Sequence, residues 1–221
     1  MYGGGYMPGW FLIGVLCAVI IFAVVIYRMS SGKVEMTPRI SDRLERKGFY
    51  SENPVKIMTR PVEVIDIKTN YIGELKREFD SVFQKMVSLI LPDYFVRIKG
   101  TDSQGRMVVL VEKDRGRKGL TGSSWNVRIS SPGCNDQFVI DGESKSFKDS
   151  VASFTFQGAP IKVTKQYGEN AYHFFKGDIE EAKVSVIGKL PPRRIFIDGS
   201  AGELPLLLTA SIIEALKLYK P

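Results

Sequence analysis

RRIFIDGSAGELPLLLTASIIEALKLY, residues 193–219, is the stretch that decides the fold. Residues 193–198 have the composition of a β-strand, and residues 204–220 predict a helix with Pro205 in its first turn, where the missing N–H costs nothing. The front half of this helix is apolar on nearly every side, whereas Glu214, Lys217 and Lys220 give the back half one polar side. A helix apolar all round must be enclosed by protein, so the rest of the fold has to surround its first two turns.

The residues before this helix alternate between apolar and polar side chains with a period of two. The alternation is visible in residues 94–99, 106–113, 125–130, 152–156, 161–164 and 182–186. Strands of this kind bury one face and leave the other in water, which is typical of an antiparallel sheet or barrel and not of a doubly wound parallel sheet. With further strands at 137–140, 171–176 and 193–198, about eight or nine strands are expected.

One amphipathic helix is predicted before these strands, over residues 72–91, and Pro92 ends it. Its apolar positions recur with helical spacing and include the aromatic residues Phe79 and Phe83. Two interpretations of this apolar face stay open. It packs on the sheet, or Phe79 and Phe83 face a partner protein.

The N-terminal stretch WFLIGVLCAVIIFAVVIY, residues 10–27, contains no charge or amide. As a helix it would be roughly 27 Å long, close to the thickness of a hydrocarbon core, and aromatic residues at both ends suit the headgroup boundaries. We therefore expect a transmembrane helix. A cleaved signal peptide is the alternative, but residues 1–9 lack the basic side chains that a signal peptide requires.

The basic residues predict the orientation of that helix, because all 31 Lys and Arg side chains follow it. By the positive-inside rule, the N-terminus lies outside and the main domain lies in the cytoplasm of a single-pass membrane protein. The expected organisation is a tail at residues 1–9, the transmembrane helix at 10–27, a basic linker at 28–60 and a domain at 61–221. The predicted fold class is α+β: the transmembrane helix, then a mainly antiparallel β-sheet or barrel with an amphipathic helix and an apolar C-terminal helix.

The best candidate binding feature is the glycine-rich stretch KDRGRKGLTGSS, residues 113–124. Lys113, Arg115, Arg117 and Lys118 supply positive charge, and the glycines free the backbone N–H groups to turn towards an anion. A phosphate, an anionic lipid such as a phosphoinositide, or an acidic protein are the ligands this pattern favours. A solvated hairpin tip without a ligand is the simpler interpretation.

Catalytic and metal-binding patterns are not recognised in the sequence. The single histidine, His173, lies in an aromatic strand, where a packed or surface imidazole is the simplest interpretation, and Cys17 and Cys134 have no metal-ligand spacing. No catalytic residue, metal or other cofactor is therefore assigned. The net charge of +7 comes largely from residues 28–60, which carry eight basic and four acidic side chains, and this distribution does not favour nucleic acid as a partner.

A run of short antiparallel strands closed by the apolar helix of residues 193–219 resembles the tubby-like superfamily, which includes phospholipid scramblases and LURP-one-related proteins. The resemblance covers residues 94–219 and rests on the order of elements, so no family residue is transferred to a position here. It implies a closed twelve-strand barrel around the C-terminal helix and, as in some members, phosphoinositide binding.

Three functions are compatible with these patterns. The first is a non-enzymatic, membrane-anchored subunit that assembles with other membrane or cytoplasmic proteins near the bilayer. The second is an anionic-lipid-binding or scramblase-like module. The third is an enzyme whose site is not recognisable from the sequence.

Overall fold

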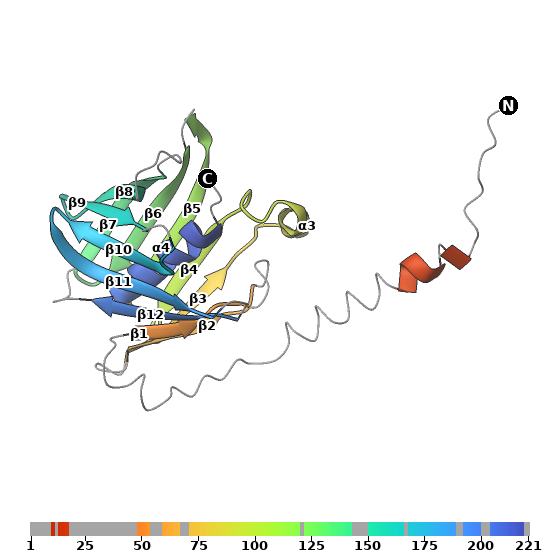
Figure 1. Cartoon of the computed structure of the whole chain (residues 1–221), viewed down its shortest axis with the longest axis horizontal. Coiled ribbons are helices and arrows are strands. Elements are labelled where there is room, and N and C mark those ends of the chain that lie inside the picture. Colours follow the sequence, from red (N-terminus) through yellow and green to blue (C-terminus); the bar gives the residue numbers. More distant parts are fainter. Residues whose placement is uncertain are drawn as a thin grey trace. The chain divides into compact units, whose positions relative to one another are not determined.

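The computed structural model describes residues 10–11, 13–17, 48–53, 59–66, 71–119, 122–142, 150–165, 168–188, 192–199 and 204–218. The chain divides into two units, Met1–Glu35 and Met36–Pro221. In the first unit, residues 10, 11 and 13–17 are helical. The second unit contains a β-barrel, with helix α4 (Leu206–Leu218) inside it and helix α3 (Val82–Ile90) outside it (Figure 1).

Twelve strands of the described chain form a closed antiparallel barrel. Each strand pairs with its neighbours in sequence, and β1 closes the ring on β12. The strands are β1 (Gly48–Ser51), β2 (Val62–Asp66), β3 (Tyr71–Arg77), β4 (Arg97–Asp102), β5 (Val108–Gly119), β6 (Gly122–Ser131), β7 (Cys134–Gly142), β8 (Ser150–Phe156), β9 (Ala159–Thr164), β10 (Ala171–Lys176), β11 (Ile179–Ile187) and β12 (Arg194–Gly199).

The alternation in the sequence determines which side chains fill the barrel. In β6, Trp125, Val127 and Ile129 are each at most 3% exposed. Val127 lies opposite Val111 of β5 and Phe138 of β7. Because residues that are paired across strands point to the same face, the inward side chains of these strands form one continuous layer.

Helix α4 occupies the interior of the barrel, where every one of its residues except Leu206, Glu214 and Lys217 is buried. The wall approaches the helix closely at Gly100 of β4. A Cβ atom at Gly100 would lie 2.8 Å from Ser211 Oγ and 3.0 Å from Leu207 Cγ. The missing side chain at this position therefore lets β4 and α4 pack in direct contact.

The predicted fold class is wrong, because the domain is mostly a twelve-strand closed barrel with short helices. Strands β1 and β2 were not recognised, and β1 lies inside the segment expected to be a linker. Its four residues GFYS are all buried, so it lacks the alternation that marks a strand in the sequence. The helix expected at 72–91 begins only at Val82, since Tyr71–Arg77 forms β3.

The expected transmembrane helix and single-pass localisation are also corrected. Within the part of the chain that the structure describes, no helix is long and apolar enough to cross a membrane. In the predicted span, the structure describes residues 10, 11 and 13–17, and these are helical. Residues 18–27 lie outside the described part, as does most of the expected linker.

Candidate functional site

The two ends of the barrel differ in charge. Because the strands alternate in direction, the connections that follow odd-numbered strands meet at one end, which we call the α3 end because α3 joins β3 to β4. The described residues of these connections and of the β5–β6 hairpin tip are 52–53, 59–61, 78–96, 113–119, 122–124, 165, 168–170, 188 and 192–193, and they include eight basic and six acidic residues. The described residues of the connections at the opposite end are 103–107, 132–133, 157–158, 177–178 and 204–205, and they include one of each. The α3 end is therefore the more positive one.

The positive charge is densest at the β5–β6 hairpin, whose tip extends past the beginning of β4. Arg97, the first residue of β4, pairs with Glu112, so residues 113–119 of β5 continue beyond it. Lys113 Nζ donates a hydrogen bond to the Asp93 carbonyl oxygen at 2.8 Å, which ties the base of the hairpin to the segment after α3. The hairpin and α3 are thus parts of one end of the barrel.

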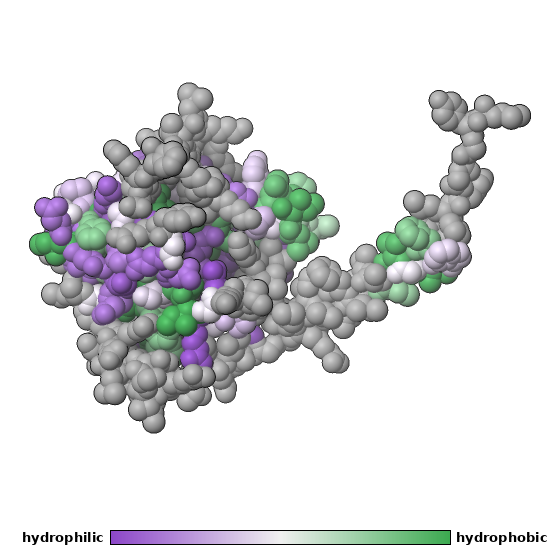
Figure 2. Space-filling view, in the orientation of Figure 1, coloured by the Kyte–Doolittle hydropathy of each residue, from purple (hydrophilic) through white to green (hydrophobic). Residues whose placement is uncertain are grey.

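Helix α3 is attached to the barrel by its polar side. Ser88 is the one residue of the helix that is buried. Its apolar residues Val82, Phe83, Met86, Leu89 and Ile90 are 77%, 69%, 62%, 54% and 83% exposed. At about 100° per residue, these five side chains span an arc of about 120° on the side away from Ser88. Figure 2 shows the result as a hydrophobic cluster at the position of α3.

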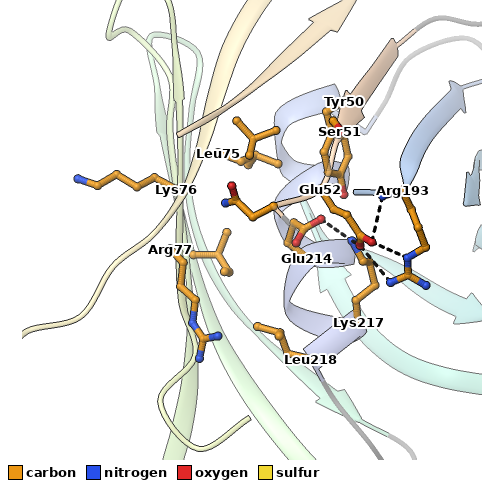
Figure 3. A pocket seen from close by; sticks show the side chains of 13 residues that line it. Tyr50, Ser51, Glu52, Leu75, Lys76, Arg77, Arg193, Glu214, Lys217 and Leu218 are labelled. Atoms are coloured by element: carbon orange, nitrogen blue, oxygen red, sulfur yellow. Dashed lines mark hydrogen bonds and ion pairs between the residues drawn. The ribbon is translucent and has the colours of Figure 1, made fainter. Parts of the chain in front are cut away.

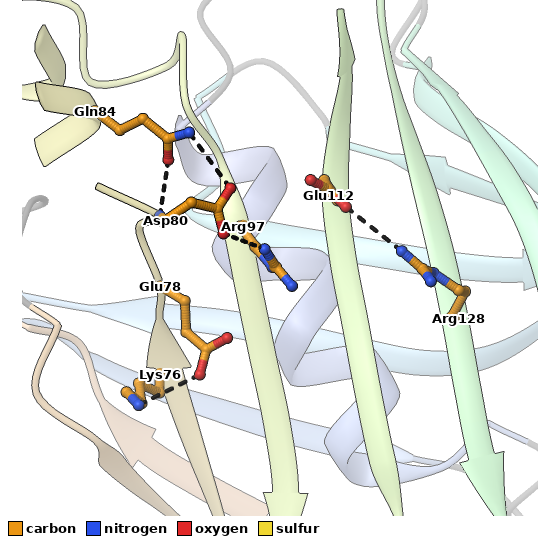
Figure 4. A network of polar contacts seen from close by, with 7 residues as sticks. All are labelled: Lys76, Glu78, Asp80, Gln84, Arg97, Glu112 and Arg128. Carbon is orange, nitrogen blue, oxygen red and sulfur yellow. Dashed lines mark hydrogen bonds and ion pairs between the residues drawn. The ribbon is translucent and has the colours of Figure 1, made fainter.

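Polar contacts hold α3 in this orientation (Figure 4). Ser81 caps the helix, its Oγ accepting a hydrogen bond from Gln84 N at 3.2 Å. The Gln84 side chain bonds Asp80 in turn, and Asp80 forms an ion pair with Arg97 of β4. These contacts fix the first turn of the helix to the barrel wall and leave its apolar side free of it.

A buried arginine, Arg77, holds the segment that follows α3. Arg77 donates hydrogen bonds to the carbonyl oxygens of Pro92 and Phe95 at 2.6 and 2.7 Å, and its guanidinium lies 4.8 Å from the centre of the Phe79 ring. Burial lowers the pKa of Arg77 to about 10, so the side chain remains charged at neutral pH. Phe79 therefore packs against Arg77, whereas Phe83 is exposed.

A cavity of about 50 Å³ opens at the α3 end, beside the C-terminal turn of α4 (Figure 3). Its apolar lining includes Val62, Leu75, Ile98 and Leu218, and its polar lining includes Tyr50, Glu52, Arg193, Glu214 and Lys217. Such a volume suits a few water molecules better than a lipid headgroup.

Glu52 is the centre of the polar side of this cavity. Its carboxylate accepts hydrogen bonds from Arg193 Nε at 2.5 Å and Nη2 at 3.0 Å, and Lys217 Nζ lies 2.7 Å from Oε2. Lys217 also bonds Glu214 at 2.7 Å. Burial alone would raise the pKa of Glu52, but the bonds to Arg193 and the charge of Lys217 outweigh burial and lower it.

The two acidic and two basic groups of this cluster balance one another. Lys76 and Arg77 also line the cavity, but Lys76 forms an ion pair with Glu78 and Arg77 donates to the two main-chain carbonyl oxygens described above. The Tyr50 hydroxyl also lies here, near the Glu214 carboxylate. Burial, followed by the nearby Glu214 carboxylate, raises the pKa of Tyr50 well above 10, and the phenol is therefore neutral. The arrangement fastens the end of α4 to β1 and to the residue before β12.

The chain matches the family model of the Tubby C-terminal like domain over residues 49–213, from β1 into α4. The chain belongs to the Tubby C-terminal like domain family. This match, together with the closed barrel around α4, confirms the resemblance to the tubby-like superfamily. Comparisons with curated proteins and with solved structures gave no match.

In this tubby-like barrel, the predicted anion-binding residues Lys113, Arg115, Arg117 and Lys118 all belong to β5. Lys113 is bonded to Asp93, and the side chains of the other three lie outside the described part of the structure. The four residues stay a predicted site, now placed at the same end of the barrel as the exposed Phe83.

The cavity cluster was missed by sequence reasoning. Glu52 and Arg193 are 141 positions apart and belong to no motif, so no signal in a single sequence joins them. His173 bonds the carboxylates of Glu169 and Glu180 at 3.1 and 3.0 Å. In the described residues, no group of three or more His, Cys, Asp or Glu side chains is arranged to hold a metal ion.

Proposed function

We propose that this tubby-like barrel is an anionic-lipid-binding module, and that it meets the lipid surface with its α3 end. The observation that carries the proposal is the density of basic residues on the β5–β6 hairpin, where residues 113–118 contain four basic side chains and one acidic side chain. The phosphoinositide binding that the superfamily resemblance implies supports the same ligand class. Each basic side chain near an anionic membrane surface contributes about 1 kcal/mol to binding.

The geometry of the α3 end favours recognition of membrane charge over recognition of one headgroup. The cavity is small, and the charged groups of its polar side already contact one another, as the bonds of Glu52 with Arg193 and Lys217 show. The basic hairpin extends beyond the neighbouring strand β4. We therefore expect affinity to follow the charge density of the bilayer.

Vesicle sedimentation tests this proposal with the full-length protein. The vesicles contain phosphatidylcholine alone, or phosphatidylcholine with phosphatidylserine or with phosphatidylinositol bisphosphate. We expect the Arg117→Ala/Lys118→Ala variant to bind both kinds of anionic vesicle about thirtyfold more weakly than the wild type, because two side chains at about 1 kcal/mol each are removed. The matched control, Arg106→Ala/Lys162→Ala, removes the same charge from two exposed positions away from the α3 end and should bind like the wild type.

If Arg117→Ala/Lys118→Ala and the wild type bound anionic vesicles equally well, the basic hairpin would not be the part of the barrel that binds anionic lipid. Equal binding to neutral and anionic vesicles would contradict the proposal as a whole. Two other functions, a subunit that assembles with other proteins and an enzyme with an unrecognised site, stay hypotheses. Co-purification of stoichiometric protein partners in mild detergent would test the assembly subunit.

A further inference from the structure

The apolar side of α3 is unusual in its orientation. A surface helix ordinarily packs its apolar side on the core and exposes its polar side. Here Ser88 faces the barrel, and Phe83, Met86 and Ile90 face away from it. Leu91 and Tyr94, which follow the helix, are 49% and 50% exposed.

From this arrangement we infer that α3 inserts its apolar side into the interface of an anionic phospholipid bilayer, and so fixes the orientation of the barrel on the membrane. The inference rests on the proposed function, since it takes the bilayer as the surface that the basic hairpin meets. A large exposed apolar surface marks a contact with protein or membrane, and the surrounding charges decide between the two.

Two features favour the bilayer. First, the exposed Lys85 lies at the edge of the apolar arc of α3. Basic side chains at the edge of an apolar face are typical of helices that lie in the membrane interface. Lys113 ties the basic hairpin to Asp93, near the end of the same helix, so cationic and apolar contacts are offered at one end of the barrel. The interface of an anionic bilayer can bind the cationic side chains and the apolar side chains at the same time.

A second copy of the chain fits this surface less well. Pairing two copies through α3 in a symmetric dimer would bring two hairpins, each with four basic and one acidic side chain in residues 113–118, to the same interface. Like charges brought together in this way oppose association, whereas the same charges assist binding to anionic lipid.

A fluorophore that shifts its emission in apolar surroundings tests the insertion directly. The label is attached at Met86→Cys in the full-length protein carrying Cys17→Ser and Cys134→Ser. The control label is attached at Gln104→Cys, an exposed position at the opposite end of the barrel. With vesicles of phosphatidylcholine and phosphatidylserine, we expect a blue shift and quenching by brominated acyl chains at position 86, and neither at position 104.

A matched pair of substitutions tests the contribution to affinity. Met86 and Ile179 are 62% and 65% exposed, and Ile179 begins β11 at the end opposite α3. Neither side chain supports the core, so Met86→Ser and Ile179→Ser should both fold normally. We expect Met86→Ser to bind anionic vesicles about tenfold more weakly, as loss of one buried apolar side chain implies, and Ile179→Ser to bind like the wild type.

The outcomes separate this inference from the proposed function. Vesicle binding that depends on the hairpin but shows no shift at position 86 overturns the insertion and leaves the lipid-binding module standing. Absence of binding to anionic vesicles overturns both. A shift at position 86 that needs no vesicles and grows with protein concentration assigns the surface to a second copy and overturns the insertion.

Discussion

Glu52 shows how much of the stability at the α3 end depends on one carboxylate. Its side chain is 7% exposed and contacts both Arg193 and Lys217. Replacing it with glutamine removes the charge while keeping the shape, so that Lys217 retains only Glu214 as an acidic neighbour among the described contacts. Removing one partner of a buried ion pair leaves the other incompletely compensated.

We expect Glu52→Gln to lower the free energy of unfolding by about 2 kcal/mol, measured by chemical denaturation. The estimate lies below the range for fully buried pairs because the cluster lines an open cavity. The exposed Glu63→Gln on β2 is the control and should change stability by no more than about 0.5 kcal/mol. Equal stability of both variants would show that the cluster is not needed to hold α4.

The pH dependence of this difference has a defined sign. Because the pKa of Glu52 is lowered in the folded protein, its ionisation stabilises the fold at any pH above its ordinary pKa of about 4.5. That stabilisation is lost as the pH falls through the lowered pKa, when the carboxylate takes up a proton.

We therefore expect the stability gap between the wild type and Glu52→Gln to be constant near neutral pH and to shrink below about pH 4. Denaturation of both proteins across this range measures the gap directly, and contributions from other acidic groups cancel in the difference. A gap that widens on acidification would contradict the assigned cause.

At the scale of elements, the close packing of β4 on α4 makes Gly100 the most informative position. A methyl group there would meet Ser211, whose Oγ is bonded to the Leu207 carbonyl oxygen at 2.7 Å, so the neighbouring atoms cannot move without breaking that contact. We expect Gly100→Ala to destabilise the protein by about 1–3 kcal/mol in thermal or chemical denaturation. Gly133→Ala, where nothing lies within 4 Å, should be nearly neutral.

A second substitution locates the cause of that destabilisation. Ser211→Ala removes the nearest atom, so adding it to Gly100→Ala should cost less than the sum of the two single changes. Strictly additive effects would mean that the clash is not with Ser211.

The sequence predicts a helix or strand correctly where the order of apolar and polar residues matches the burial of that element. It misses elements whose burial departs from the usual pattern. Helix α4 is apolar all round and is enclosed, and β6 alternates and buries one face, so each shows its environment in its own residues. Strand β1 is buried throughout its four residues and lacks that pattern. Helix α3 has the ordinary amphipathic pattern with the opposite orientation, and no periodicity tells which side faces the barrel.

At the scale of the whole molecule, the candidate site arises from topology. Residues 78–96 and 113–124 contribute to one surface only because β3, β4, β5 and β6 are consecutive strands of an antiparallel barrel. The basic residues of the hairpin were recognisable from the sequence. Their position beside an exposed apolar helix follows from the register of β4 on β5, which a single sequence does not specify.

The basic hairpin and the apolar side of α3 should contribute to vesicle affinity with different dependences on salt. Raising the ionic strength from about 0.1 M to 1 M shortens the Debye length from about 10 Å to about 3 Å and suppresses the electrostatic part of binding, while burial of the α3 side chains persists. Affinities of the wild type and Arg117→Ala/Lys118→Ala for anionic vesicles should therefore converge as salt rises. The loss caused by Met86→Ser should stay at about tenfold, because an apolar contact contributes the same factor at either ionic strength. Sedimentation of the three proteins over this range measures both trends, and a Met86→Ser loss that vanished with salt would show that α3 acts only through the hairpin.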